Sequence, residues 1–152
     1  ITRVQPISKN GVSLTRVYER VLSNGTTEPL GQPKVGDLVK VTLTAALPDR
    51  SLRYLAIDDP LPSSFRAINT LFDSQTSGRN KEQSSWRISN TEVRTDRVLF
   101  FVDYIQASQN FEMSYHARVT HEGEVYAPPT KVEEMYDPEN YALSASKILT
   151  VR

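Results

Sequence analysis

Cysteine is absent from this sequence. Its absence excludes disulfides, thiolate metal sites and a thiol nucleophile within the chain, and it leaves the redox compartment open. No apolar run approaches the roughly 20 residues that a membrane-spanning helix needs, so we expect no direct membrane insertion. The 18 basic and 18 acidic residues balance, so no net charge attracts nucleic acid. Any partner must therefore be recognised by a local feature of the surface.

The length of the chain, 152 residues, is that of a single domain. The first ten residues, ITRVQPISKN, contain neither an initiator methionine nor a secretion signal. We therefore expect residues 1–152 to be one domain excised from a larger protein, with residues 1–10 as a linker.

Alternating apolar and polar residues predict β-strands in several segments, of which 39–45 (VKVTLTA) and 111–119 (FEMSYHARV) are the clearest. In residues 98–105, VLFFVDYI, apolar side chains would lie on both faces of a strand, which is typical of an inner strand covered on two sides. Turn-forming pairs such as Asn24-Gly25 and Glu122-Gly123 separate the runs. Seven or eight short strands separated by such turns predict an all-β, antiparallel β-sandwich of Ig-like type.

One segment departs from this pattern. In residues 62–72, PSSFRAINTLF, the side chains of Phe65, Ile68 and Phe72 lie near helical spacing, so we expect at most one short helix here. The β-branched residues and Asn69 make it a poor helix former. Residues 74–85 are polar enough to predict a long loop.

The sequence supports no catalytic or metal site. His116 and His121 have no serine or aspartate at an activating spacing, and a zinc site needs more soft ligands. The acidic residues near position 135 lack the glycine-punctuated alternation of a calcium loop. Asp58 and Asp59 precede a proline and point to opposite faces of a strand, so they are expected at a strand end. We therefore predict no enzyme activity, no metal and no cofactor.

Basic residues gather between positions 79 and 97, with Trp86 among them. Such interleaving is found in grooves that bind single-stranded nucleic acid. Acidic residues in the same segment weaken the positive electrostatic potential of the basic ones. A single tryptophan in a β-domain more often packs in the core. We therefore expect no nucleic-acid partner.

Residues 131–144, KVEEMYDPENYALS, place Met135 and Tyr136 within an acidic segment. Because prolines precede this segment and Pro138 interrupts it, residues 130–142 are predicted to be a loop that crosses between the sheets. Two interpretations are open. The two side chains either pack on their own domain or cover an apolar or reactive site on another one.

Three segments together resemble one known family: IDDPLP (57–62), DRVLFFVDY (96–104) and YHARVTHEGEVYAPPTKVEEMYDPENYALS (115–144). The chain from about Val12 onward is similar to the C-terminal macroglobulin-like domain of bacterial alpha-2-macroglobulins, equivalent to the receptor-binding domain of the animal proteins. The resemblance implies a macroglobulin-like sandwich within a broad-spectrum protease inhibitor. It also implies a periplasmic location, with the full-length protein anchored to the inner membrane as a lipoprotein.

In such a protein, a protease cuts a bait region and a thioester in a Cys-x-Glu-Gln motif captures it. Since the chain has no cysteine, the thioester would belong to another domain of the same polypeptide. The resemblance implies that Met135 and Tyr136 shield this thioester until activation, with Asp137, Pro138 and Tyr141 as loop support. Burial of such a pair would contribute about 3–5 kcal/mol, partly offset by ordering of the loop.

Alternatives remain from other classes of protein. A free-standing Ig-like adhesin or carbohydrate-binding module would present a flat aromatic patch. A hydrolase is disfavoured because no nucleophile, base and orienting group are identified. Where the full-length protein has no thioester, the segment around Met135 would make interdomain contacts only.

Overall fold

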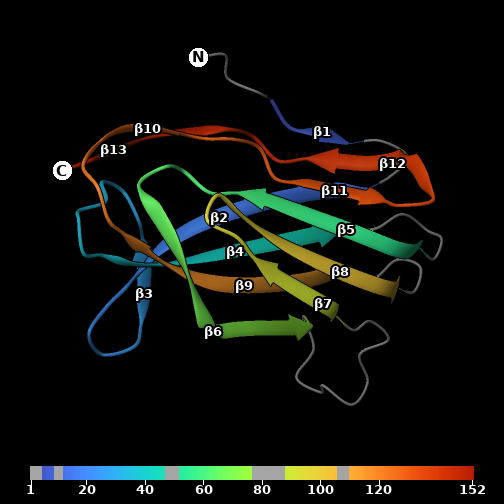
Figure 1. Cartoon of the computed structure of the whole chain (residues 1–152), viewed down its shortest axis with the longest axis horizontal. Coiled ribbons are helices and arrows are strands. Elements are labelled where there is room, and N and C mark those ends of the chain that lie inside the picture. Colours follow the sequence, from blue (N-terminus) through green and yellow to red (C-terminus); the bar gives the residue numbers. More distant parts are fainter. Residues whose placement is uncertain (1–4, 9–11, 47–51, 77–87, 106–109) are drawn as a thin grey trace.

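The computed structural model describes residues 5–8, 12–46, 52–76, 88–105 and 110–152. Within these ranges the chain forms β-strands joined by turns, and it contains no helix that could cross a membrane (Figure 1). The strands pair in antiparallel fashion in two large sheets and one two-stranded ribbon. The predicted all-β antiparallel sandwich is confirmed, although thirteen strands replace the expected seven or eight.

The five-stranded sheet has the order β3-β2-β4-β9-β6. Its strands are β2 (Ser13–Val21), β3 (Thr27–Pro29), β4 (Leu38–Ala46), β6 (Phe65–Thr76) and β9 (Asn110–Val119). The predicted Asn24-Gly25 turn joins β2 to β3, and Gly25 takes the positive φ of 88° that this turn needs. This sheet forms the lower layer in Figure 1.

The six-stranded sheet lies above it in the order β1-β12-β11-β5-β8-β7 (Figure 1). Its strands are β1 (Ile7–Ser8), β5 (Leu52–Pro60), β7 (Ile88–Val93), β8 (Arg97–Ile105), β11 (Lys131–Glu134) and β12 (Asp137–Leu143). The ribbon consists of β10 (Gly123–Ala127) and β13 (Lys147–Val151). Ile7 and Ser8 of β1 fall inside the segment interpreted as a linker.

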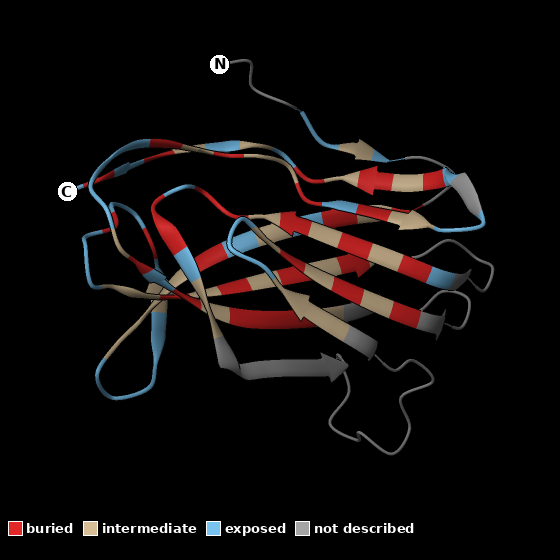
Figure 2. Cartoon of the chain, in the orientation of Figure 1, coloured by how far each residue is buried: buried red, intermediate tan, exposed pale blue. Residues whose placement is uncertain are grey.

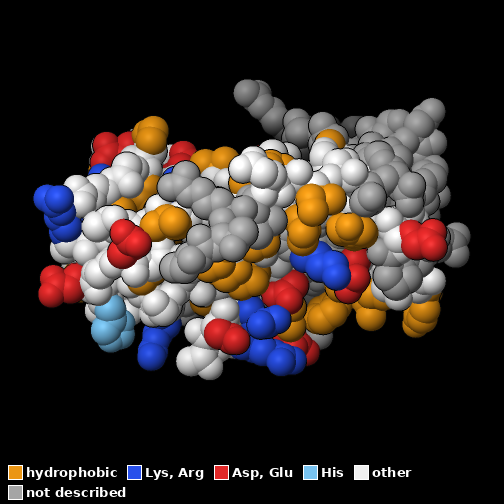
Figure 3. All heavy atoms as spheres, turned by 90° about the horizontal axis from the view of Figure 1, so that it is seen from above, with side chains coloured by type: hydrophobic (Ala, Val, Ile, Leu, Met, Phe, Trp, Pro, Cys, Tyr) orange, Lys and Arg blue, Asp and Glu red, His pale blue; other side chains and the backbone are white. Residues whose placement is uncertain are grey.

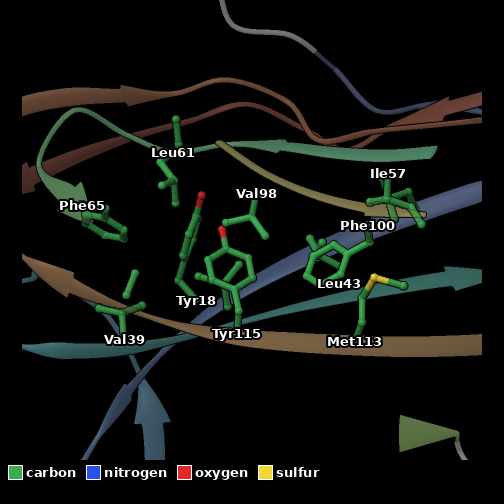
Figure 4. Packing of buried hydrophobic residues seen from close by; sticks show 14 of the residues in the cluster. Tyr18, Val39, Leu43, Ile57, Leu61, Phe65, Val98, Phe100, Met113 and Tyr115 are labelled. Carbon is green, nitrogen blue, oxygen red and sulfur yellow. The ribbon is translucent and has the colours of Figure 1, made fainter. Parts of the chain in front are cut away.

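The core lies between the two sheets and follows the predicted alternation (Figure 2). Every second residue of β4, from Val39 to Ala45, is at most 1% exposed, and β9 alternates likewise from Met113 to Val119. On β8, alternate residues from Val98 to Val102 are buried, whereas Leu99 and Phe101 on the other face are only partly covered. Figure 4 shows Met113, Leu43 and Phe100 meeting between the layers.

The short helix expected within residues 62–72 is wrong, because Phe65–Thr76 form β6. β6 pairs with β9, from Phe65 opposite Val119 to Thr76 opposite Phe111, with a register shift between Ile68 and Asp73. Phe65 is 3% exposed, and its ring packs edge-on against Tyr18, 5.8 Å away. The open edge of β9 supplies backbone hydrogen bonds that a weak isolated helix cannot match. Ser74–Thr76 of the expected loop therefore belong to β6, and residues 77–85 of it lie outside the described residues.

A buried ion pair connects the two sheets. The guanidinium of Arg16 on β2 lies 2.8 Å from the carboxylate of Asp59 on β5, and the two side chains are 2% and 0% exposed. The Asp59 carboxylate also accepts a hydrogen bond from the hydroxyl of Thr130, at 2.7 Å, and one from the hydroxyl of Tyr115 on β9. Its charge is thus paired and hydrogen-bonded, as a buried carboxylate requires.

The same cluster reaches the ribbon. Arg16 donates to the backbone carbonyl of Ala127, the last residue of β10, at 3.4 Å, and to that of Ala145, shortly before β13, at 3.5 Å. Thr130 and Ser144 exchange two hydrogen bonds of 2.9 Å across the same region. Both sheets and the ribbon are therefore joined at one polar point.

Arg16 and Tyr115 keep the protonation states that these contacts require. Burial alone would lower the pKa of Arg16, but the neighbouring Tyr18 and Asp59 hold it above its ordinary value, so the guanidinium remains charged. Burial raises the pKa of Tyr115 well above its usual range, and the Asp59 charge raises it further. Tyr115 therefore remains a neutral hydrogen-bond donor. Figure 4 shows its hydroxyl beside that of Tyr18, on the side away from the five-stranded sheet.

Replacing Asp59 with Asn should lower the free energy of unfolding by about 3–5 kcal/mol, because the Arg16 charge would be left buried without its counterion. Urea denaturation of the chain at neutral pH measures the effect. The double variant Arg16→Met with Asp59→Asn should lose less than the sum of the two single variants. Additive losses would contradict a direct interaction.

Asp58 provides a matched comparison on the opposite face of β5, where it pairs with Arg97 at 2.8 Å. Burial raises the pKa of the Asp58 carboxyl, only partly opposed by Arg97. A raised folded-state pKa means that the ionised form weakens folding as the pH rises through that value. Asp58→Asn should therefore be at least as stable as the unmodified chain at pH 7, and this advantage should vanish below about pH 4. Urea denaturation at both pH values tests this, and a loss at pH 7 as large as that of Asp59→Asn would refute it.

Candidate functional site

Residues 131–143 form a β-hairpin, so the loop predicted for residues 130–142 is wrong. Val132 on β11 pairs with Ala142 on β12, and both are 0% exposed. β11 also pairs with β5, from Lys131 opposite Asp58 to Glu134 opposite Leu55. The buried pair and the two ladders stabilise this segment as inner sheet despite its acidic composition.

The proline that suggested a loop is accommodated by a bulge. The ladder passes from Glu133 opposite Tyr141 to Glu134 opposite Asp137. Pro138 falls among the residues skipped by this shift, where its lack of a backbone N–H costs no ladder hydrogen bond. The side chain of the buried Asn140 donates to the Glu134 carboxylate at 2.8 Å and so braces the bulge. The side chains of Asp137 and Pro138, proposed as loop support, lie outside the described residues.

Met135 and Tyr136 form the turn of this hairpin, at the right-hand end of the molecule in Figure 1. Met135 is 47% exposed and Tyr136 is 80% exposed. Two-residue hairpin turns usually contain asparagine or glycine, so two large side chains here are unusual. Neither side chain is enclosed between the sheets, although the Tyr136 ring contacts Tyr54 of the same domain.

Tyr54 on β5 lies beside this turn, and sequence reasoning missed it. Its ring meets that of Tyr136 edge to face, with centroids 5.1 Å apart and planes at 88°. Its backbone carbonyl accepts a hydrogen bond of 2.8 Å from the N–H of Met135. Tyr54 is itself 47% exposed. We call Tyr54, Met135 and Tyr136 the tip cluster.

Tyr54 also has an unusual backbone. It is the one described residue other than glycine with a positive φ, 57°. The ladder with β8 pairs Arg53 and Leu55 but passes over Tyr54. A positive φ is sterically costly for a bulky side chain and is concentrated at functional positions. Neither this conformation nor the pairing of β5 with β11 leaves a signal in the sequence.

Tyr141 is placed on β12 rather than in a loop. Its half-buried ring lies 5.8 Å from the Lys131 amine on the neighbouring strand, so it packs on its own sheet. It does not join the tip cluster.

The other candidate groups do not assemble into a site. His121 is exposed, with its Nδ1 2.8 Å from the Thr120 hydroxyl, whereas His116 is half-buried on β9. No group of three histidine, aspartate or glutamate side chains placed to hold a metal occurs in the described part of the chain. Of the basic segment, Arg94 pairs with Glu92, while residues 79–87, with Trp86, lie outside the described residues. On the face in Figure 3, acidic and basic side chains are interspersed.

The chain matches a model of a known protein family. Residues 11–139 match the model described as "Bacterial Alpha-2-macroglobulin MG10 domain". The matched range includes all three residues of the tip cluster.

Full-length proteins and solved structures agree with this match. An alpha-2-macroglobulin homolog from Nostoc sp. is 26% identical over 97% of the chain, which spans 8% of that protein. The structure of Salmonella alpha-2-macroglobulin reacted with methylamine has a TM-score of 0.74 at 25% identity, covering 99% of this chain and 10% of that one. The structure of Escherichia coli alpha-2-macroglobulin activated by porcine elastase has a TM-score of 0.76 at 25% identity, covering 98% and 14%.

Proposed function

The chain belongs to the family of bacterial alpha-2-macroglobulin MG10 domains, and we propose that it is a non-enzymatic docking domain of a protease inhibitor. In this proposal the Met135–Tyr136 turn covers the thioester of another domain of the same polypeptide until a protease cuts the bait region. Proteases are then partners of the full-length protein, and no cofactor is required.

The single observation that carries the proposal is the exposure of Met135 and Tyr136, 47% and 80%, at the end of the β11–β12 hairpin. Five large hydrophobic side chains are exposed among the described residues, and three of them form the tip cluster. An apolar group concentrated at one end of a domain favours a docking contact over random surface exposure.

The chemistry of a thioester gives this contact a purpose. An amine nitrogen attacks the acyl carbon, the C–S bond breaks, and the sulfur leaves as a thiolate that takes up a proton. The products are an amide and a free thiol. Water attacks the same carbon. Covering the acyl carbon with a thioether and an aromatic ring excludes both nucleophiles without placing a competing nucleophile beside it.

The energetics suit a reversible cover. The two side chains would bury enough apolar surface to contribute about 3–5 kcal/mol. The hairpin is held by β5 and by the Asn140–Glu134 hydrogen bond, so little entropy remains to be lost on docking. A contact of this strength holds a cover closed and is released when one domain moves as a rigid body.

Two relatives support the expected reactivity. One is a Salmonella alpha-2-macroglobulin that was reacted with methylamine, and the other is an Escherichia coli alpha-2-macroglobulin that was activated by porcine elastase. An inhibitor of this kind would respond both to a small amine and to a protease.

The geometry of the tip cluster weighs against the carbohydrate-binding alternative. Stacking on a sugar ring uses the flat face of one or more parallel aromatic rings. The rings of Tyr54 and Tyr136 are perpendicular, at 88°. They present an edge beside a face, which suits a shaped apolar contact better than a flat platform.

We further propose that the full-length protein is periplasmic and anchored to the inner membrane as a lipoprotein. Fractionation of cells that express it should then place it with the inner membrane and make it accessible to protease added to spheroplasts. Recovery in the cytosolic fraction would refute this location.

Replacing both Met135 and Tyr136 with Ala in the full-length protein should raise the rate of thioester loss to methylamine at least about tenfold. The reason is that each 1.4 kcal/mol lost from the free energy of the covering contact corresponds to a factor of ten. Release of the free thiol, followed with a chromogenic disulfide, measures the rate.

Val17→Ala provides the matched control. Val17 is 50% exposed on β2, in the other sheet, so its truncation should leave the rate unchanged. An unaltered rate in the Met135/Tyr136 variant would refute shielding, as would a full-length protein that releases no thiol with methylamine.

A further inference from the structure

We propose that Tyr54 is a positioning residue for the shielding turn: its ring fixes the ring of Tyr136 and its carbonyl fixes the backbone at Met135. The inference rests on the proposed shielding function and extends it to a residue on another strand, about 80 positions earlier in the sequence.

A backbone hydrogen bond ties the turn to β5. The Met135 N–H donates to the Tyr54 carbonyl at 2.8 Å, one residue beyond the last ladder pair, Glu134 opposite Leu55. The β5–β11 ladder thus continues into the turn itself. A turn tied to a third strand is held more rigidly than one supported only by its own hairpin.

An aromatic contact links the rings of Tyr54 and Tyr136. Tyr136 is 80% exposed, so the surrounding chain leaves its ring largely uncovered. The edge-to-face contact with Tyr54, at 5.1 Å, favours one orientation of the Tyr136 ring. A side chain ordered before docking loses less rotamer freedom when it docks.

The backbone of Tyr54 is strained. At a φ of 57°, glycine would fit position 54 without steric cost, whereas tyrosine is disfavoured. β5 therefore carries a ring where the backbone alone would favour glycine. The ring at this position lies half-exposed against Tyr136, so its described contact serves the turn rather than the core.

Tyr54→Gly separates positioning from folding. Glycine removes the ring and relieves the strain, so the thermal unfolding midpoint of the full-length protein should not fall appreciably. The rate of thiol release with methylamine should rise about 2- to 12-fold, the factor that corresponds to one lost edge-to-face pair. Tyr54→Asn, which also tolerates a positive φ, should behave in the same way.

Two further variants define the mechanism. Tyr54→Phe keeps the ring and should react at the unmodified rate. In a Tyr136→Ala background, Tyr54→Gly should add little, because a residue that acts through Tyr136 has nothing left to orient.

The rates of these variants distinguish a failure of the role of Tyr54 from a failure of shielding. Unmodified rates in both Tyr54→Gly and Tyr54→Asn would overturn the inference while leaving shielding intact, provided that the Met135/Tyr136 variant is fast. Equal acceleration by Tyr54→Phe, or additive effects with Tyr136→Ala, would also overturn it. If the Met135/Tyr136 variant itself reacts at the unmodified rate, the shielding function fails together with the role of Tyr54.

Discussion

The buried pair of Arg16 and Asp59 is the interaction on which the arrangement of the layers depends. Its two residues come from opposite sheets, and its hydrogen-bond partners include Tyr115 of β9, Thr130 before β11 and the carbonyls that flank the ribbon. Apolar packing brings two sheets together but permits them to slide, since dispersion contacts have little directional preference. A charge pair that must be fully satisfied has few acceptable geometries. Thr130 lies directly before β11, so the same pair also fixes where the β11–β12 hairpin begins.

The main features of the fold could be predicted because they depend on local alternation. In β4 and β9 every second residue is almost fully buried, as the sequence indicates, and this pattern was enough to predict a sandwich. β6 and the β11–β12 hairpin were mispredicted because distant partners determine them. The edge of β9 converts a weak helix into a strand, and Val132, buried against Ala142, outweighs the surrounding acidic residues and Pro138. Arg16 did leave a signal in the sequence, since it lies on the same face of its strand as the buried Leu14 and Tyr18. A charged residue at such a position implies a buried partner.

The candidate site was only partly visible in the sequence. Met135 and Tyr136 stand out because large apolar residues are unexpected among carboxylates, and the structure places both on the surface. Tyr54 could not be found in this way. Nothing in the segment around it suggests a positive φ, and its neighbour Tyr136 becomes adjacent only when β5 pairs with β11. Sites assembled from two strands far apart in sequence are in general accessible only once the sheet order is known.

The hairpin turn and the C-terminal ribbon occupy opposite ends of the long axis of the molecule (Figure 1). Displacement on rotation grows with distance from the pivot. A modest swing of the domain about the ribbon end would therefore carry Tyr136 through a wider arc than the strands near the middle of the sandwich. Such leverage requires a stiff arm, and the ladders of β5, β11 and β12 supply it. The sandwich can thus magnify a slight reorientation at one extremity into a clear separation at the other, with no strand unpaired.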